Sequence, residues 1–352
     1  MLRLLARSMS ILVWVSLIYS VPFLSRLYTK TMDNDASISI LTWADVFDSE
    51  TLDAFTKKTG IKVRLSYYES NEEMLVKLQA TGGKGYDLIV PSDYAVAVLK
   101  ERNLLQKIDH TKVPAIETFL PTVTHQPFDL LNEYSLPYLW EIFVLGIDNR
   151  VVSPDIEPSW KLLFNPPVGV RVAMASDPRE AMIFAHQYVY GNPAPIIPEQ
   201  MRVLELLLRE QKKEVEAYVE FRADYLLATH NCGVAVSSSS YILRSMEQFP
   251  HIGFVVPREG TFITVENFVI PKASQKADLV YRFMNHIYEP DVMAHLYEAF
   301  SFFPATRAGL EHSSIADSEH QLLSVAQTVP LHFIQLLTTE KELQKFWVAV
   351  KS

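Results

Sequence analysis

From Ser37 onward the chain alternates short apolar strands with amphipathic helices. A strand buries every second side chain and a helix buries one stripe, so repeated strand and helix units favour a sheet covered by helices. Glycines such as Gly60 and Gly82 mark where the helices end. We predict strands at 38–42, 61–65 and 88–90, and helices at 49–58, after the capping box Ser70–Glu73, and at 94–102. These units form one α/β lobe.

A second α/β lobe is predicted after a long apolar segment. Residues 134–149 read YSLPYLWEIFVLGIDN, which is typical of extended chain that runs between two lobes. We predict that the second lobe holds strands at 172–176 and 233–236 and a helix from Glu199 to Tyr218. The extended stretch 252–270 then returns toward the first lobe, before helices at 276–288, at 292–300 and from Thr339. Two lobes crossed more than once imply a cleft with a hinge.

Composition and charge limit the class of protein. The 352 residues, 49% apolar and 21% charged, are enough for two domains with a large core. The formal charge of -9 and the absence of a Lys/Arg run argue against nucleic acid as a partner. Cys232 is the only cysteine in the sequence. It therefore excludes an internal disulfide and a cysteine-based zinc cluster.

The first 30 residues differ from the rest. Arg3 and Arg7 precede the uncharged, apolar stretch 8–25, and Arg26 closes it. This pattern is typical of an export signal, although Pro22 interrupts it and no A-x-A cleavage site follows. Cleavage and retention as a membrane anchor both stay open. We therefore expect residues 1–30 to direct the body of the protein to the periplasm.

Polar and aromatic residues follow three of the predicted strands. Trp43 and Asp45 come after the first, residues 91–94 (PSDY) after another, and residues 177–180 (DPRE) after a third. In open α/β sheets, ligands bind outside the carboxyl ends of the strands. Carboxylates gathered there would suit a cation.

A structural interpretation of the same residues also stays open. Asp177 at the N-cap, Pro178 at the first helical position and Glu180 two residues later make a complete helix start. Ser92 and Asp93 could likewise cap the helix that begins at Tyr94. Sequence alone does not decide between capping and ligand binding.

From about Ile38 to Pro304 the chain resembles the bacterial spermidine/putrescine-binding proteins of ABC transporters. The resemblance rests on the stretches TKKTGIKVRLSYYESNEEMLVKL, YDLIVPSDYAV, LLQKID, YSLPYLWEIFVLGIDN and SDPRE. It implies an α/β fold of the two-lobed type II periplasmic binding proteins, with a hinged cleft between domains. The expected boundaries are 36–142 plus 266–310 for the first lobe and 143–265 plus 311–352 for the second.

The resemblance also implies a function. A polyamine would lie between the lobes, with carboxylates on its ammonium groups and aromatic rings along its methylene chain. A membrane permease would be the partner of a monomeric receptor with no catalytic role, cofactor or metal. The residues that match the family's binding positions are Trp43, Asp45, Ser92, Tyr94, Asp177, Glu180 and Glu266, with Asp93 as a possible further acid and Gln335 on a looser alignment.

The chain departs from the family pattern at several positions. Val46, Val236 and Thr264 stand where the family has aromatic residues, and Ala44 replaces a threonine. We therefore expect a thinner aromatic cage around an intact set of acids. The preferred polyamine stays open.

Three other functions are compatible with parts of the sequence. Adjacent Tyr67 and Tyr68 superficially suggest a receptor for ferric ion, but neighbouring residues on a strand point to opposite faces. A carboxylate-dependent hydrolase is the alternative from another class. The sequence has no G-x-S-x-G elbow, residues 237–240 read as a helix start, and residues 82–85 lack Walker spacing. A receptor for another organic amine is the remaining alternative.

Overall fold

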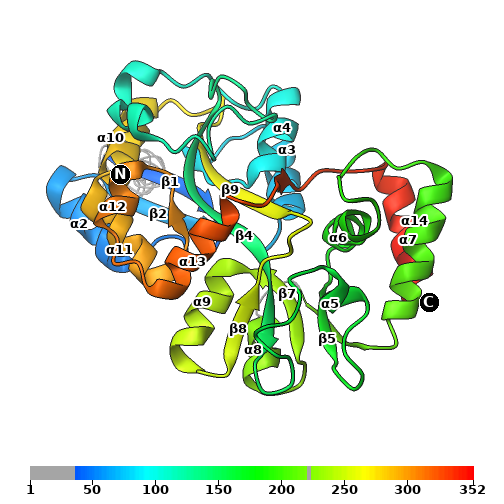
Figure 1. The fold of residues 1–352 in the computed structure, drawn as a ribbon. Coiled ribbons are helices and arrows are strands. Elements are labelled where there is room, and N and C mark those ends of the chain that lie inside the picture. The colour runs from blue at the N-terminus through cyan, green and yellow to red at the C-terminus, as the bar shows by residue number, and fades with distance from the viewer. Residues whose placement is uncertain (1–35, 220–222) are drawn as a thin grey trace, which may run out of the picture.

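The computed structural model describes residues 36–219 and 223–352. The predicted export signal or anchor at 1–30 lies outside the described residues. One mixed sheet runs through both lobes in the order β2-β1-β3-β9-β4-β7-β5-β6. The helices lie on either side of this sheet (Figure 1). This order confirms the alternation that the sequence predicts.

The first lobe is built on the early strands. Strands β1, β2 and β3 are parallel, and β3 then pairs antiparallel with β9. The strands of this part of the sheet are β1 (Ser37–Thr42), β2 (Lys62–Tyr67), β3 (Leu88–Ile89), β9 (Thr261–Val269), β10 (Phe303–Pro304) and β11 (Leu331–Phe333). The helices beside it are α2 (Ser49–Thr59), α3 (Asn71–Thr81), α4 (Asp93–Glu101), η1 (His110–Lys112), η2 (Pro114–Thr118), α10 (Ala277–Ile287), α11 (Pro290–Phe300), α12 (Arg307–His312) and α13 (Asp317–Ala326).

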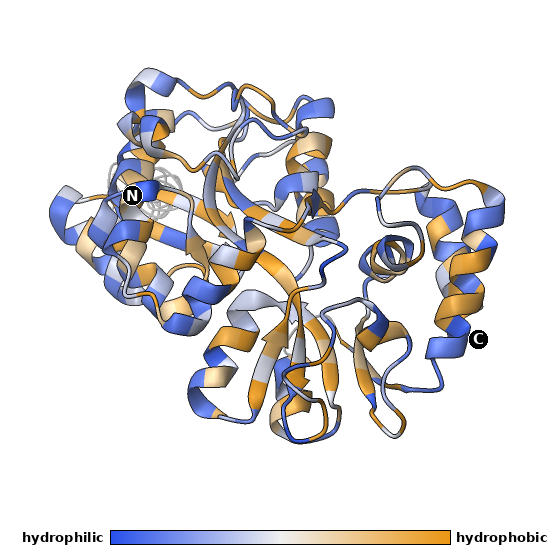
Figure 2. Cartoon of the chain, in the orientation of Figure 1, coloured by the Kyte–Doolittle hydropathy of each residue, from blue (hydrophilic) through white to orange (hydrophobic). Residues whose placement is uncertain are grey.

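The second lobe continues the sheet. The strands that complete it are β5 (Val172–Ala175), β6 (Val215–Val219), β7 (Val234–Ser238) and β8 (Ile252–Val255). Its helices are α5 (Lys161–Phe164), α6 (Pro178–Tyr190), α7 (Pro198–Gln211), α8 (Ala223–Ala228), α9 (Ser239–Gln248) and α14 (Glu340–Lys351). Figure 2 shows orange, apolar strands in the interior and blue, polar patches on the helices that cover them. The hydrophobic pattern therefore matches the layers.

Strand β4 (Ser135–Asp148) joins the two lobes. Residues 135–142 pair with β9, and residues 143–147 pair with β7. The chain crosses again between β8 and β9, and the segment after α13 runs back to α14, which lies beside α7 (Figure 1). The predicted extended segment 134–149 is thereby confirmed. The predicted domain boundaries stay a prediction, although β4 changes partner close to residue 142.

The predicted helix from Glu199 to Tyr218 is wrong in its last two turns. Helix α7 ends at Gln211, and residues 215–219 form β6, which pairs parallel with β5. The sequence Val-Glu-Ala-Tyr-Val alternates and is rich in β-favouring residues, so sheet pairing outweighs the helical pattern before it. The stretch 252–270, predicted as extended chain, consists of the two strands β8 and β9, divided by a turn at Gly260.

Gly260 illustrates why that turn needs glycine. Its φ is 105°, a conformation that L residues rarely adopt, and a Cβ there would lie 2.8 Å from the carbonyl oxygen of Pro330. Two of the segments that join the lobes therefore pack against each other closely at this point.

Among the described residues, none of the helices has the length and apolar character needed to cross a bilayer.

Candidate functional site

A cleft of about 1030 Å³ lies between the two lobes. The ends of β1 and β2 and the starts of α3 and α4 line one wall, and the starts of α6, α8 and α9 line the other. Among the described residues that line it, seven are carboxylates and two are arginines. The acids are Asp45, Glu69, Glu72, Asp177, Glu180, Asp224 and Glu266, and the arginines are Arg179 and Arg244. The cleft therefore carries an excess of negative charge, which favours a cationic ligand.

The structure brings seven of the nine predicted site residues to this cleft. They are Trp43, Asp45, Ser92, Tyr94, Asp177, Glu180 and Glu266. In the described part of the chain, Asp93 and Gln335 are not among the lining residues. Asp93 is the first residue of α4 and is buried, and its Oδ1 accepts from the Tyr94 backbone N–H at 2.6 Å. Gln335 is exposed, and its amide donates to the Pro193 carbonyl at 3.3 Å.

Glu266 is the centre of the first-lobe wall. The Ser92 hydroxyl donates to its Oε1 at 2.7 Å, and the Trp43 indole N–H donates to its Oε2 at 2.8 Å. Ser92 occupies the N-cap position of α4 but makes no side-chain capping bond there. Its hydroxyl points instead to the carboxylate on β9. Three predicted residues from three distant parts of the sequence therefore form one hydrogen-bonded group.

The surroundings of Glu266 control its charge. Burial raises the pKa of Glu266 to about 8, against the two hydrogen bonds that lower it, and the nearby acids Asp93 and Glu141 raise it further. Burial likewise raises the pKa of Asp93 to about 7 and that of Glu141 above its ordinary value. At neutral pH the protonated form of Glu266 is favoured. A ligand cation beside it would favour the carboxylate.

Asp177 and Glu180 approach from the second lobe, at the start of α6. The Asp177 carboxylate caps this helix by accepting from the backbone N–H groups of Arg179 at 2.6 Å and Glu180 at 3.2 Å. The capping interpretation is therefore confirmed for Asp177. The same side chain lines the cleft, so its capping role leaves ligand binding possible.

Aromatic rings are more numerous than the sequence indicated. Val46, Val236 and Thr264 do line the cleft as non-aromatic residues. However, Tyr68 packs against Trp43 with a centroid distance of 4.4 Å. The aromatic residues that line the cleft are Trp43, Tyr68, Tyr94, Phe143, Tyr225, Tyr241, Phe249 and Phe302. Rings from other elements are thus present in a cleft where three positions expected to be aromatic hold Val46, Val236 and Thr264.

Tyr67 and Tyr68 do not converge on one point. Tyr67 is 55% exposed, whereas Tyr68 is 3% exposed and its hydroxyl donates to the Val90 carbonyl at 2.6 Å. One phenol is therefore exposed and the other buried and hydrogen-bonded, and they do not form a paired iron site.

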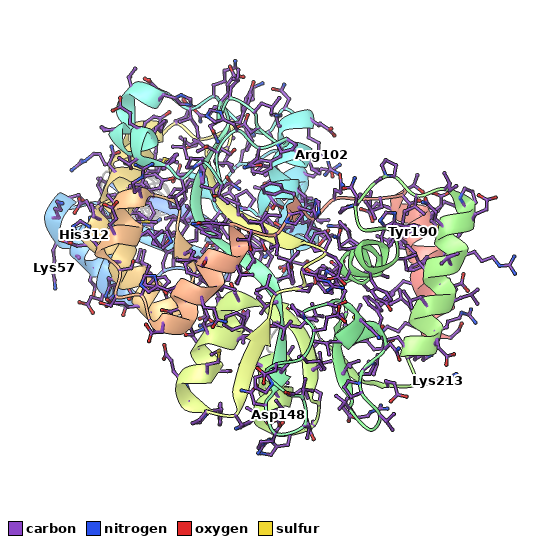
Figure 3. All side chains as sticks on the ribbon, viewed as in Figure 1. Lys57, Arg102, Asp148, Tyr190, Lys213 and His312 are labelled. Atoms are coloured by element: carbon purple, nitrogen blue, oxygen red, sulfur yellow. The ribbon has the colours of Figure 1, made fainter. Side chains whose placement is uncertain are left out.

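A group of His and Asp side chains lies far from the cleft. In the described ranges, Asp148, His230 and His251 have possible ligand atoms within 4.8 Å of one another. Figure 3 places Asp148 at the end of the second lobe that is remote from the first. The Arg150 Nε donates to Asp148 Oδ1 at 2.8 Å, and its hydrogen bonds and charge lower the pKa of that carboxyl. Arg150 also contacts His230. The Asp148 carboxylate is therefore already paired with the Arg150 guanidinium, which takes the place that a metal ion would need.

Comparison with known proteins assigns the chain to a family. The model of bacterial extracellular solute-binding proteins matches residues 50–321, well over half of the chain. The chain belongs to this family. The resemblance and the two-lobed fold class stated from the sequence are confirmed.

Individual relatives agree with this assignment. The chain is 28% identical over 275 residues to the spermidine/putrescine-binding periplasmic protein of Escherichia coli, covering 77% of this chain and 78% of the relative. It is 28% identical over 258 residues to a putrescine/cadaverine-binding protein of Pseudomonas aeruginosa, covering 70% and 73%.

A similar solved structure supports the fold. The spermidine/putrescine ABC transporter substrate-binding protein of Streptococcus pneumoniae superposes with a TM-score of 0.77 at 22% identity, covering 90% of this chain and 98% of that one.

Sequence reasoning missed several residues of the cleft. The sequence pattern predicts Glu72 only as part of a helix start and Arg179 only as part of the DPRE segment. It indicates Tyr68 only as a candidate iron ligand. The signal for Tyr68 was available, because it directly follows β2, at the same sheet edge as Trp43.

Proposed function

We propose that this chain is an extracytoplasmic receptor that binds a small organic polycation, of the putrescine or spermidine class, between its lobes. The observation that carries the proposal is the partly buried, hydrogen-bonded group of Trp43, Ser92 and Glu266, which lines the same cleft as the acids Asp177 and Glu180. A buried ammonium must be paired with an acceptor, and aromatic faces suit the methylene chain between two ammonium groups.

The route and the partner belong to the same proposal. The periplasmic names of the relatives support export of this chain by residues 1–30 and delivery of the ligand to an ABC permease. The lobes sample open and closed forms, and a ligand that contacts both walls favours the closed form. The ligand leaves chemically unchanged, because a receptor of this family binds and releases its solute.

Calorimetric titration tests the proposal. Residues 31–352 are purified, unfolded and refolded to remove any bound ligand, and titrated with putrescine, cadaverine and spermidine. We expect saturable one-to-one binding at micromolar affinity or tighter, no heat with neutral amino acids or ferric citrate, and full recovery of the amine by mass spectrometry. Folded protein that binds none of the three amines would contradict the proposal.

Replacing Asp177 by Asn separates the charge from the helix cap. Asn caps a helix about as well as Asp, so the stability of the fold should change little. We expect the affinity for putrescine to fall about tenfold, which is about 1.4 kcal/mol, because Asp177 is only half-buried and solvent screens its charge. Calorimetry and thermal denaturation of the same variant measure the two effects. A loss of stability without a loss of affinity would restrict Asp177 to capping.

Binding is expected to release protons below pH 8. The pKa of Glu266 is about 8, and a bound ammonium lowers it by favouring the carboxylate. The amine itself stays protonated in this range. The apparent affinity should therefore rise by up to about tenfold per pH unit from pH 6 toward 8 and then level off. Titrations at pH 7 in two buffers of different ionisation enthalpy measure the protons released, and identical heats in both would contradict the expectation.

A further inference from the structure

Arg179 joins the two lobes through a charged contact. It is the second residue of α6 in the second lobe, and its side chain reaches across the cleft to α3 of the first lobe. Its Nη2 donates to Glu72 Oε1 at 2.6 Å, and its side chain is only 9% exposed. The Arg179 side chain is therefore largely removed from solvent, whereas the Glu72 side chain is 50% exposed, so solvent screens part of this ion pair.

Tyr94 of α4 completes this contact from the first lobe. The guanidinium carbon lies 4.4 Å from the centroid of the Tyr94 ring, and the Tyr94 hydroxyl donates to the same Glu72 oxygen at 2.9 Å. A planar guanidinium can pair with a carboxylate and stack on a ring at the same time, which an ammonium does less well. One arginine thereby engages two first-lobe side chains at once.

The charges in this contact support each other. Burial alone would raise the pKa of Glu72, but the hydrogen bond and charge of Arg179, with the Tyr94 hydroxyl, leave that pKa below its ordinary value. Glu72 is therefore ionised when the contact is formed. Arg179 also lies 3.5 Å from Glu340 of α14, which belongs to its own lobe and is 62% exposed. Only the contact with Glu72 and Tyr94 depends on how close the lobes are.

We propose that Arg179 is a closure latch, a positioning residue whose contact with Glu72 and Tyr94 forms only when the lobes close. The inference rests on the proposed function and adds a control of affinity to it. The free energy of the contact between Arg179, Glu72 and Tyr94 shifts the equilibrium between the open and closed forms. The apparent affinity of a ligand that binds only the closed form scales with the closed fraction, so the latch changes the affinity for every such ligand by the same factor.

This uniform effect distinguishes a latch from a ligand contact. A side chain that touches the ligand discriminates between amines of different length and charge. If the Arg179 guanidinium instead occupied the place of a ligand ammonium group, replacing Arg179 would raise the affinity for the longer amine. A latch does neither, because the Arg179 guanidinium contacts Glu72, Tyr94 and Glu340 and its loss acts on closure.

The test uses the full chain with Arg179→Met, Glu72→Gln and the double variant. Glu340→Gln is the matched control, because it removes an acid that contacts the same guanidinium from within its own lobe. Calorimetry gives the affinity for putrescine, cadaverine and spermidine. Small-angle scattering without any amine gives the radius of gyration, which grows as the closed fraction falls. Thermal denaturation confirms that each variant is folded, and Glu72→Gln tests the contact even where Arg179→Met fails to fold.

We expect each single variant to lose about tenfold in affinity, by the same factor for all three amines. The double variant should lose no more than either single one, because both remove the same contact. The scattering radius should increase for these variants and stay unchanged for Glu340→Gln. Unequal losses across the amines, additive losses in the double variant, or a gain in affinity for spermidine would overturn the latch.

The two proposals fail in different ways. If no amine binds but the scattering radius still depends on Arg179 and Glu72, the polyamine assignment falls and the latch stands. If the amines bind and neither affinity nor radius responds to Arg179→Met, the latch falls and the assignment stands.

Discussion

Replacement of Glu266 by Gln is expected to lower the affinity for putrescine by about thirtyfold to several thousandfold. This range corresponds to roughly 2 to 5 kcal/mol for removing one partner of a buried charge pair. The carboxylate accepts from both Ser92 and Trp43 and lines the cleft. An amide keeps the shape but cannot neutralise an ammonium. Calorimetric titration of wild type and variant at pH 8 measures the loss.

The fold should tolerate this change. Because burial raises the pKa of Glu266 to about 8, the neutral form is already favoured at pH 7 without a cation, and Gln resembles that form. The Ser92 hydroxyl can turn to accept from the new amide. The proton release on binding should disappear in the variant. Glu69→Gln is the matched control, because Glu69 is an exposed acid on the same cleft, and its affinity should stay within about threefold. Equal losses at both positions would assign the effect to the general field of the cleft.

The first lobe could be predicted from the sequence because each of its signals is local. Asp48 and Gly60 bound α2 as cap and stop, and Ser70 caps α3 through the Glu73 backbone N–H. The same locality explains the error after α7. The strand β6 exists because β5 lies beside it, and its partner is about 40 residues away in the sequence. A local pattern cannot show such a partner.

The candidate site also has residues that the local sequence pattern predicts and contacts that it does not. Trp43, Ser92 and Asp177 were found because they follow strands, where parallel sheets gather ligand-binding residues. The hydrogen bonds of Trp43 and Ser92 to Glu266 span 223 and 174 residues, so only the family resemblance could connect them in advance. The contact of Arg179 with Glu72 required the two lobes to be placed relative to each other. Neither residue type nor spacing carries that information.

Replacement of Trp160 by Ala should give the largest loss of stability among the substitutions considered. Trp160 is fully buried in the second-lobe core, stacks on Phe184 at 5.1 Å, and donates from its indole N–H to the Gly260 carbonyl at 2.8 Å. The cavity and the orphaned carbonyl should together lower the free energy of unfolding by about 3 to 5 kcal/mol. Urea denaturation followed by circular dichroism measures the change.

The place of Trp160 in the fold makes this loss matter for function. Its bond holds Gly260 in the turn that joins β8 to β9, and the neighbouring Ser159 hydroxyl donates to Glu259 of the same turn. This turn is one of the crossings between the lobes, so the variant should also close less readily and bind more weakly where it is still folded. Trp347→Ala is the matched control. Trp347 is a half-buried tryptophan of α14 that packs against Tyr218, away from the crossings, and should cost less stability without changing affinity. An equal loss of affinity in both variants would mean that the turn at Gly260 has no special part in closure, because general softening of the second lobe would then suffice.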